Sequence, residues 1–168
     1  KGTKITFKID KELIKDKTPK FEEFYFPNGI IDYAKKNYDK NEKIISKFFY
    51  KELKINDIER FEVYVSFNKD NKSSLSSFCN TVETPDGGSH ENSLKNALLQ
   101  SIKLFGKKNQ ITKIPNIGFT DLFDFSDSFI SIFINNPIFE GQTKKRISMP
   151  KLQKKLEVEL QKYFLLWL

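Results

Sequence analysis

Alternating apolar and polar residues predict half-buried strands in two parts of the chain. Residues 3–9 alternate over a short stretch, and residues 61–67 alternate without interruption. Successive side chains of a strand point to opposite faces of the sheet, so this pattern indicates a strand with one buried face. The apolar face of the second strand consists of Phe61, Val63, Val65 and Phe67.

Three further apolar runs have the length of strands, at residues 44–50, 75–82 and 129–134. The last of these is rich in β-branched and aromatic residues, which favour strands. A polar turn at residues 68–71 separates the strand at 61–67 from the run at 75–82. We therefore expect those two strands to form an antiparallel hairpin.

Apolar residues at helical spacing predict the helices. A short amphipathic helix begins at Ile30, directly after a Pro-Asn-Gly turn, and another short helix is expected at residues 119–125. A longer helix starts near Ser89 and is expected to stop at Gly106. A final helix runs from Pro150 to the end of the chain. The apolar faces of the two long helices are Leu94, Ala97, Leu98, Ile102, Leu104 and Phe105, and Leu152, Leu156, Leu160 and Phe164.

The order strand, helix, strands, helix, strand, helix favours one α+β domain in which helices pack on a sheet. A length of 168 residues fits one such domain. The charged residues 11–20 and the basic residues 107–116 lack periodicity and are expected to be a linker and a loop. A chain that begins inside a strand pattern suggests a fragment, because a first strand needs a sheet to join.

The composition favours some partners and excludes two kinds of metal site. The net charge of +7 favours an anionic partner, such as a nucleic acid, a nucleotide or an acidic membrane surface. Solvated lysines are the alternative, and the bias of the sequence toward Lys, Ile and Phe favours it. The single cysteine, Cys79, excludes an internal disulfide and a cysteine cluster, and the single histidine, His90, excludes a site of several histidines. We expect no bound metal.

The hydropathy pattern gives no sign of a membrane segment. No apolar run approaches the roughly 20 residues that span a bilayer. The first residues read as a strand and not as a signal peptide. We therefore expect a soluble, cytoplasmic protein without a membrane partner.

One short loop combines residues that suit phosphate binding. Residues 140–144 read Glu-Gly-Gln-Thr-Lys and follow the run at 129–134 and an Asn-Asn-Pro turn. Gly141 allows the backbone to turn tightly, and Lys144 can offer a mobile positive charge to a phosphate. A Gly-x-x-Lys loop is also common as a solvated turn, so the spacing alone leaves both interpretations open.

Two blocks of sequence together resemble a known family. The first, residues 80–90, reads Asn-Thr-Val-Glu-Thr-Pro-Asp-Gly-Gly-Ser-His, and the second, residues 137–144, reads Pro-Ile-Phe-Glu-Gly-Gln-Thr-Lys. Their order and separation resemble the transducer domain of the ATPase subunit of bacterial type II topoisomerases. Residues 24–33 and the closing Trp167-Leu168 look more like the B subunit of topoisomerase IV than that of gyrase.

The resemblance implies a fold and a division of the chain. The fold is a mostly antiparallel sheet packed by helices, with a left-handed β-α-β crossover. Residues 1–10 would end the preceding GHKL nucleotide-binding domain, residues 11–24 would be a linker or a chain break, and residues 25–168 would form the transducer. The family carries a longer segment before Phe24 and a more glycine-containing stretch at residues 119–124.

The resemblance also implies roles for single residues. Gln142 and Lys144 contact the γ-phosphate of ATP, and Lys144 is the catalytic residue of this chain. The other groups that bind ATP and Mg²⁺ belong to the preceding domain, so we expect this fragment alone to bind neither. Gly87 and Gly88 form a structural turn into the helix, and His90 in its first turn is expected to be a packing residue and not a catalyst.

The resemblance predicts a location for Lys95, and the alternation of apolar residues predicts one for Cys79. Lys95 stands where the family has a basic residue near the cavity that holds transported DNA, and a solvated helix face is the alternative. Cys79 alternates inward in its strand, so we expect it in the core.

The implied function is part of an ATP-dependent type II DNA topoisomerase that couples ATP binding and hydrolysis to DNA strand passage. The implied partners are DNA, a second B subunit when ATP binds, and the A subunit of topoisomerase IV, in a heterotetramer of two A and two B subunits at the bacterial nucleoid. The alternatives are the transducer of the gyrase B subunit, a basic DNA-binding module unrelated to topoisomerases, and the transducer of another GHKL protein such as a mismatch-repair ATPase. The Gln-Thr-Lys and Gly-Gly-Ser-His blocks argue against the last of these.

Overall fold

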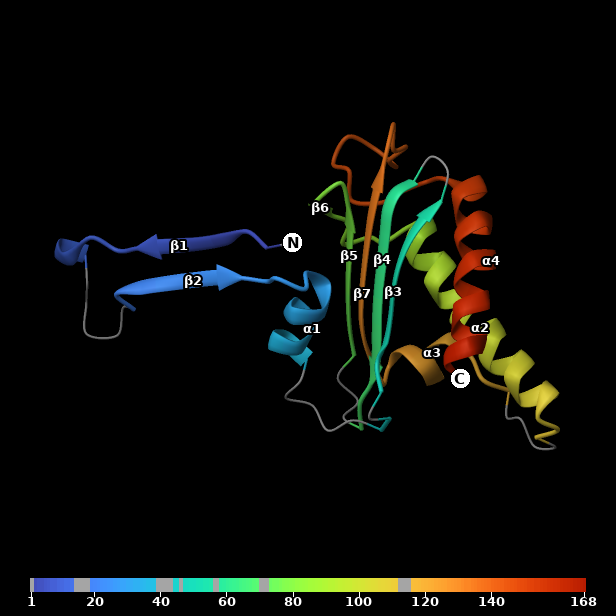
Figure 1. Cartoon of the computed structure of the whole chain (residues 1–168). Coiled ribbons are helices and arrows are strands. Elements are labelled where there is room, and N and C mark those ends of the chain that lie inside the picture. Colours follow the sequence, from blue (N-terminus) through green and yellow to red (C-terminus); the bar gives the residue numbers. More distant parts are fainter. Residues whose placement is uncertain are drawn as a thin grey trace. The chain divides into compact units, whose positions relative to one another are not determined.

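The computed structural model describes residues 2–13, 19–38, 44–45, 47–55, 58–69, 73–111 and 116–168. Parts of the predicted linker, turn and loop, at residues 14–18, 70–72 and 112–115, lie outside this range, as does residue 46 of the strand expected at 44–50. The chain forms two compact units, Lys1–Asp39 and Lys40–Leu168. Each unit has its own sheet (Figure 1).

The first unit contains a two-stranded antiparallel sheet and one α-helix. Its elements are β1 (Lys4–Lys8), the 3-10 helix η1 (Lys11–Leu13), β2 (Phe21–Tyr25) and α1 (Ile30–Tyr38). The strand expected at residues 3–9 and the helix start at Ile30 are confirmed. The expectation that this strand is half-buried is wrong, because every residue of β1 is exposed. Strand β2 was not foreseen, because its apolar residues are separated by Glu22 and Glu23 and do not alternate.

The second unit contains a five-stranded sheet in the order β3-β4-β7-β5-β6. Its strands are β3 (Phe49–Ile55), β4 (Ile58–Phe67), β5 (Ser74–Cys79), β6 (Val82–Glu83) and β7 (Ser126–Ile134). Strands β5 and β7 are parallel, and the other neighbours are antiparallel. The sheet is therefore mixed but mostly antiparallel, and helices pack on it, which confirms the α+β prediction.

The expected hairpin of β4 with β5 is wrong, because β7 lies between these strands. Strand β7 pairs with β4 from Ile134 opposite Ile58 to Ser126 opposite Phe67. It is buried along almost its whole length, so it occupies the centre of the sheet with a partner on each side. The polar turn after β4 can join neighbouring strands, but it can also join strands that have a third strand between them. Here β7 takes the place between β4 and β5, so the turn does not form a hairpin.

The strand expected at residues 44–50 begins only at Phe49. The register with β4 places Phe49, Lys51 and Leu53 on the same face as the apolar residues of β4. Lys51 interrupts the apolar alternation, and its ammonium lies 3.9 Å from the centre of the Tyr163 ring. Lys51 can occupy this face because its side chain lies over an aromatic ring. Since a lysine breaks the apolar alternation, the periodicity did not predict the strand beyond Tyr50.

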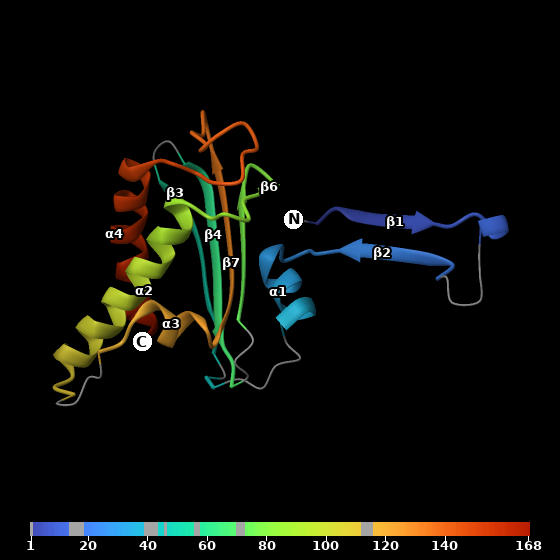
Figure 2. The same cartoon turned by 180° about the vertical axis from the view of Figure 1, so that it is seen from behind.

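Three helices accompany the sheet, and the two long ones lie side by side on one of its faces (Figures 1 and 2). They are α2 (Ser89–Lys108), α3 (Phe119–Phe123) and α4 (Pro150–Trp167). The predicted apolar faces are confirmed, except that Ile102 and Phe105 are only partly buried and Leu104 is exposed. The buried positions are Leu94, Ala97, Leu98, Leu152, Leu156, Leu160 and Phe164.

Gly106 does not end α2, which continues to Lys108. The helix ends instead in a pair of backbone hydrogen bonds, from the Gln110 amide to the Lys107 carbonyl and from the Ile111 amide to the Gly106 carbonyl. Gln110 has a φ of 54°, so it takes the left-handed conformation that often belongs to glycine at this position. Because Gln110, and not a glycine, takes the left-handed conformation after the helix, the position of Gly106 predicted the wrong end for α2.

The core lies between the sheet and the pair α2 and α4. Val63 and Ile130 are fully buried on the helix-facing side, and the rings of Phe49 and Phe164 stack with centroids 4.0 Å apart. Cys79 is also buried there, as expected. Helix α2 lies in the connection between the parallel strands β5 and β7, and the left-handed sense of this crossover stays a prediction. Among the described residues, no helix is long and apolar enough to cross a membrane.

Candidate functional site

The two sequence blocks that carry the family resemblance lie against each other in the structure. We call residues 84–90 the base turn, and residues 141–145 the tip loop. The Ile147 amide donates to the Gly87 carbonyl at 3.1 Å, and the Ser89 amide donates to the Ile147 carbonyl at 3.0 Å. Ile147 therefore forms a parallel bridge to Gly88 and is almost fully buried. The chain leaving β7 thus returns to the start of α2.

The tip loop projects from a narrow hairpin. The Glu140 amide donates to the Arg146 carbonyl at 2.8 Å, and the Ser148 amide donates to the Ile138 carbonyl at 2.9 Å. Gly141 and Lys144 both have positive φ, 78° and 55°. Glycine adopts this conformation freely, whereas a lysine in it is strained and needs support from its surroundings.

Both candidate phosphate-binding residues are exposed at the tip loop. Gln142 and Lys144 lie on the solvent-facing surface. The Lys144 ammonium is 6.0 Å from the centre of the Phe139 ring, a distance at which cation–π attraction is weak. In the described part of the chain, the Gln142 side chain makes no hydrogen bond. An amide and an ammonium are therefore available together to an anionic ligand.

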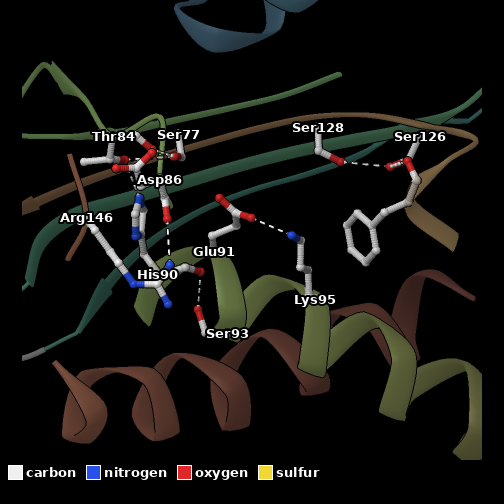
Figure 3. A network of polar contacts seen from close by, with 11 residues as sticks. Ser77, Thr84, Asp86, His90, Glu91, Ser93, Lys95, Ser126, Ser128 and Arg146 are labelled. Atoms are coloured by element: carbon white, nitrogen blue, oxygen red, sulfur yellow. Dashed lines mark hydrogen bonds and ion pairs between the residues drawn. The ribbon is translucent and has the colours of Figure 1, made fainter. Parts of the chain in front are cut away.

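Arg146 joins the hairpin to the base turn. Its Nε lies 2.9 Å from a Glu140 carboxylate oxygen. Its Nη1 donates to the Asp86 carbonyl at 2.8 Å (Figure 3). The Asp86 amide in turn donates to the Lys145 carbonyl at 3.1 Å. One guanidinium thus contacts both blocks, next to the tip loop.

The two glycines of the base turn have different steric roles. A Cβ on Gly88 would lie 2.2 Å from the Ile147 carbonyl oxygen and 2.6 Å from its nitrogen. Gly88 also has a φ of 124°. A Cβ on Gly87 would meet only the end of the Glu91 side chain, at 2.2 Å. Gly88 is therefore the residue that lets the hairpin backbone approach the base turn.

His90 is fully buried behind the base turn. Its Nε2 lies 3.1 Å from the Thr84 hydroxyl, which in turn is 2.8 Å from the Ser77 hydroxyl (Figure 3). Its Nδ1 has no hydrogen-bond partner among the described residues. Burial lowers the pKa of His90 to about 4, so the imidazole is neutral at pH 7. A buried, neutral ring whose Nε2 contacts Thr84 fits a packing role.

Lys95 lies one helical turn beyond Glu91 and forms an ion pair with it. The two charged atoms are 2.5 Å apart, and about a third of the Lys95 side chain is exposed (Figure 3). The ammonium also lies 5.9 Å from the centre of the Phe123 ring. Lys95 is therefore a partly neutralised cation and takes no part in the contacts of the tip loop.

Three residues of this arrangement were missed by sequence reasoning: Ser89, Arg146 and Ile147. Helix α2 begins at Ser89, as expected, and its N-cap is Gly88, which makes no side-chain cap bond. The Ser89 hydroxyl instead accepts the Met149 amide at 2.7 Å. The contacts of Ser89, Arg146 and Ile147 join residues about 60 positions apart, so local sequence patterns do not predict them. For Arg146, the sequence shows only that a basic residue stands two positions after Lys144.

The described residues contain no group of three or more His, Cys, Asp or Glu side chains that could hold a metal ion.

Comparison with known proteins places this arrangement in a family. The family model described as DNA gyrase B matches residues 29–168. The B subunit of DNA topoisomerase 4 from Rickettsia felis is 32% identical over 166 residues, which are 98% of this chain and 25% of the relative. The B subunit of DNA gyrase from Metamycoplasma hominis is 32% identical over 158 residues, which are 88% of this chain and 23% of the relative. The chain thus spans about a quarter of the length of the curated relatives it matches.

The fold is also shared with solved structures. The 43K ATPase domain of Thermus thermophilus gyrase B, crystallised with an aminocoumarin, superposes with a TM-score of 0.78 at 21% identity. That match covers 98% of this chain and 43% of the other. Together with the family model, which matches most of the sequence, these likenesses identify the chain as a member of the DNA gyrase B family.

Proposed function

We propose that this chain is the transducer of a topoisomerase IV B subunit, which couples ATP binding and hydrolysis to DNA strand passage. The observation that carries the proposal is the exposed tip loop with Gln142 and Lys144, held against the N-terminus of α2. Membership of the DNA gyrase B family and the topoisomerase 4 relative support it. The gyrase B relative at the same identity keeps the gyrase transducer as the second candidate.

In this function, Lys144 and Gln142 meet the γ-phosphate of ATP. The ammonium offsets negative charge that develops on the phosphoryl oxygens during transfer, and the Gln142 amide donates a hydrogen bond to one of them. The remaining nucleotide contacts and the Mg²⁺ site come from the preceding GHKL domain, to which residues 1–10 would belong. The isolated chain therefore binds neither ATP nor Mg²⁺ usefully.

The same contact lets the transducer respond to the state of the nucleotide. When the γ-phosphate is present, the tip loop is held, and when it leaves after hydrolysis, the loop is released. Because the tip loop is bonded to the base turn, movement of the loop is transmitted to α2. Lys95 on α2 would then contact the phosphate backbone of DNA by exchanging its partner Glu91 for a phosphate.

The proposed assembly contains two B subunits that close on each other when ATP binds, and two A subunits, with DNA as the substrate at the bacterial nucleoid. Gyrase and topoisomerase IV are distinguished by reconstitution of the full-length protein with the A subunits of each enzyme. Decatenation without negative supercoiling supports topoisomerase IV, and negative supercoiling supports gyrase.

The deciding variant is Lys144→Ala in the full-length protein. We expect kcat for ATP hydrolysis to fall by about 100-fold or more, because a charge that stabilises the transition state is lost. The matched control is Lys145→Ala, which removes the same charge from the adjacent exposed residue and leaves the backbone bond to Asp86 intact. Near-normal turnover of Lys144→Ala, with a folded protein, would show that the assignment is wrong.

A further inference from the structure

We propose that Arg146 is the positioning residue of the tip loop: its guanidinium, held between Glu140 and the Asp86 carbonyl, sets where Gln142 and Lys144 point. This inference rests on the proposed function, because it concerns the same contact with the γ-phosphate. Arg146 itself acts through the loop and not on the nucleotide.

Arg146 lies in the hairpin directly after the tip loop, where its contacts can fix the conformation of that loop. Glu140 and Arg146 are joined by a backbone hydrogen bond of 2.8 Å and by a side-chain ion pair of 2.9 Å. Residues 141–145 lie between them and form the tip loop. This pair is therefore the last cross-link before the residues that would meet the phosphate.

A second set of bonds fixes this cross-link to the body of the domain. Arg146 Nη1 donates to the Asp86 carbonyl at 2.8 Å, and the Asp86 amide donates to the Lys145 carbonyl at 3.1 Å. The Ile147 bridge to Gly88 follows one residue further from the tip. The side chain of Arg146 thus adds a second tie between the hairpin and Asp86, next to the backbone bond of Lys145 (Figure 3).

The tip loop itself has little else to hold its conformation. In the described part of the chain, the side chains of Gln142 and Thr143 make no hydrogen bonds. Lys144 has a φ of 55°, a conformation that a lysine keeps only when its surroundings impose it. A fixed planar guanidinium with two partners is suited to impose it, whereas a lysine at the same place would make a single flexible contact.

Arg146 is expected to contribute little to the overall stability of the domain. Its side chain is 45% exposed and that of Glu140 is 63% exposed, and ion pairs in such positions are screened by water. Its loss should therefore leave the protein folded and alter the placement of Lys144. Misplacement of a catalytic group by a fraction of an ångström to an ångström lowers turnover by roughly 10- to 100-fold.

The test uses the full-length protein with Arg146→Ala, Arg146→Lys, Glu140→Gln and the double variant Arg146→Ala/Lys144→Ala. We expect Arg146→Ala to lower kcat for ATP hydrolysis by roughly 10- to 100-fold. Arg146→Lys should recover only part of it, and Glu140→Gln should also lower kcat. In the Lys144→Ala background, Arg146→Ala should cause a much smaller loss than in the wild type, because most of its effect passes through Lys144 and only the remainder through Gln142.

Three results would overturn the inference. Normal turnover in Arg146→Ala would do so, and so would an additive loss in the double variant, which indicates a separate contact with the nucleotide. Normal or improved turnover in Glu140→Gln would also do so, because the ion pair would then not be needed to place the tip loop. Urea unfolding of each variant identifies any that fail to fold, and Glu140→Gln then carries the test.

The proposed function and this inference can fail separately. If Lys144→Ala alone retains full turnover, the proposed function is wrong. If Lys144→Ala is inactive and Arg146→Ala is normal, only this inference is wrong.

Discussion

The tip loop and the base turn are neighbours in space, but they are built in opposite ways. The tip loop is exposed, and its conformation is set by backbone bonds at its ends and by one arginine. The base turn contains the fully buried His90 and Thr84, and its Gly88 contacts the hairpin backbone without room for a side chain. The proposed phosphate-binding residues are thus exposed, whereas the turn that supports them is buried. Substitutions in the two regions should therefore have different effects.

The largest effect on stability is expected from Gly88→Ala. The new Cβ would lie 2.2 Å from the Ile147 carbonyl oxygen, and the φ of 124° is unfavourable for alanine. The free energy of unfolding of the 168-residue chain, measured by urea titration, should fall by about 3 kcal/mol. Gly141→Ala in the tip loop is the matched control, because its φ is also positive but nothing lies within 4 Å of the new Cβ. It should cost only about 1 kcal/mol, and equal losses in both variants would remove the contrast between the regions.

A smaller loss in the free energy of unfolding is expected from protonation of His90. Its folded-state pKa of about 4 lies below the ordinary value of 6.5, so the unfolded chain binds this proton first as pH falls. The stabilising contribution of the neutral ring is complete above pH 6.5 and is lost between pH 6.5 and 4. Between pH 7 and pH 5 the loss should be about 2 kcal/mol.

The matched variant for this measurement is His90→Gln, which removes the titrating ring and keeps a polar group for Thr84. Carboxylates titrate in both proteins, so the difference between their urea-unfolding curves at about pH 7 and about pH 5 isolates the histidine. A difference that does not change with pH would mean that His90 is charged or exposed in solution, contrary to its burial here.

The smallest effect on stability is expected from Lys144→Gly. Glycine adopts the positive φ of residue 144 without strain, but it also makes the unfolded chain more flexible, so the two changes nearly cancel. The free energy of unfolding should change by less than about 0.5 kcal/mol, while the full-length protein loses its ATPase activity. A large loss of stability would show that the Lys144 side chain is part of the support and not only of the chemistry.

The sequence predicted the parts of the molecule that depend on local pattern. The alternation at Phe61 to Phe67 and the spacing of Leu152, Leu156 and Leu160 predicted strand β4 and helix α4. The expectation that only one face of β4 is buried is wrong, because Glu62, Tyr64 and Ser66 on its other face are buried as well. Cys79 was placed in the core by the alternation in its own strand, and burial raises the pKa of its thiol to about 11. Family resemblance singled out both sequence blocks, and the family match contradicts the alternative of a DNA-binding module unrelated to topoisomerases.

The parts that were missed depend on contacts between distant residues. The insertion of β7 between β4 and β5 cannot be read from the turn after Phe67, because it results from the choice of partners across the whole sheet. The role of Gly88 is set by Ile147, and that of Arg146 by the Asp86 carbonyl. No local pattern marks these residues, since each acquires its role only when the two blocks come together.

The central position of β7 also has a consequence for the way in which the protein is made. Strands β3 to β6 leave the ribosome well before β7, so β4 and β5 must wait for a central partner that is synthesised later. During this interval each presents an unpaired edge, and pairing of distant segments makes folding slow. Nascent chains that stop before residue 126 should therefore aggregate, and light scattering from released chains of increasing length would show solubility returning only once Ser126–Ile134 is included.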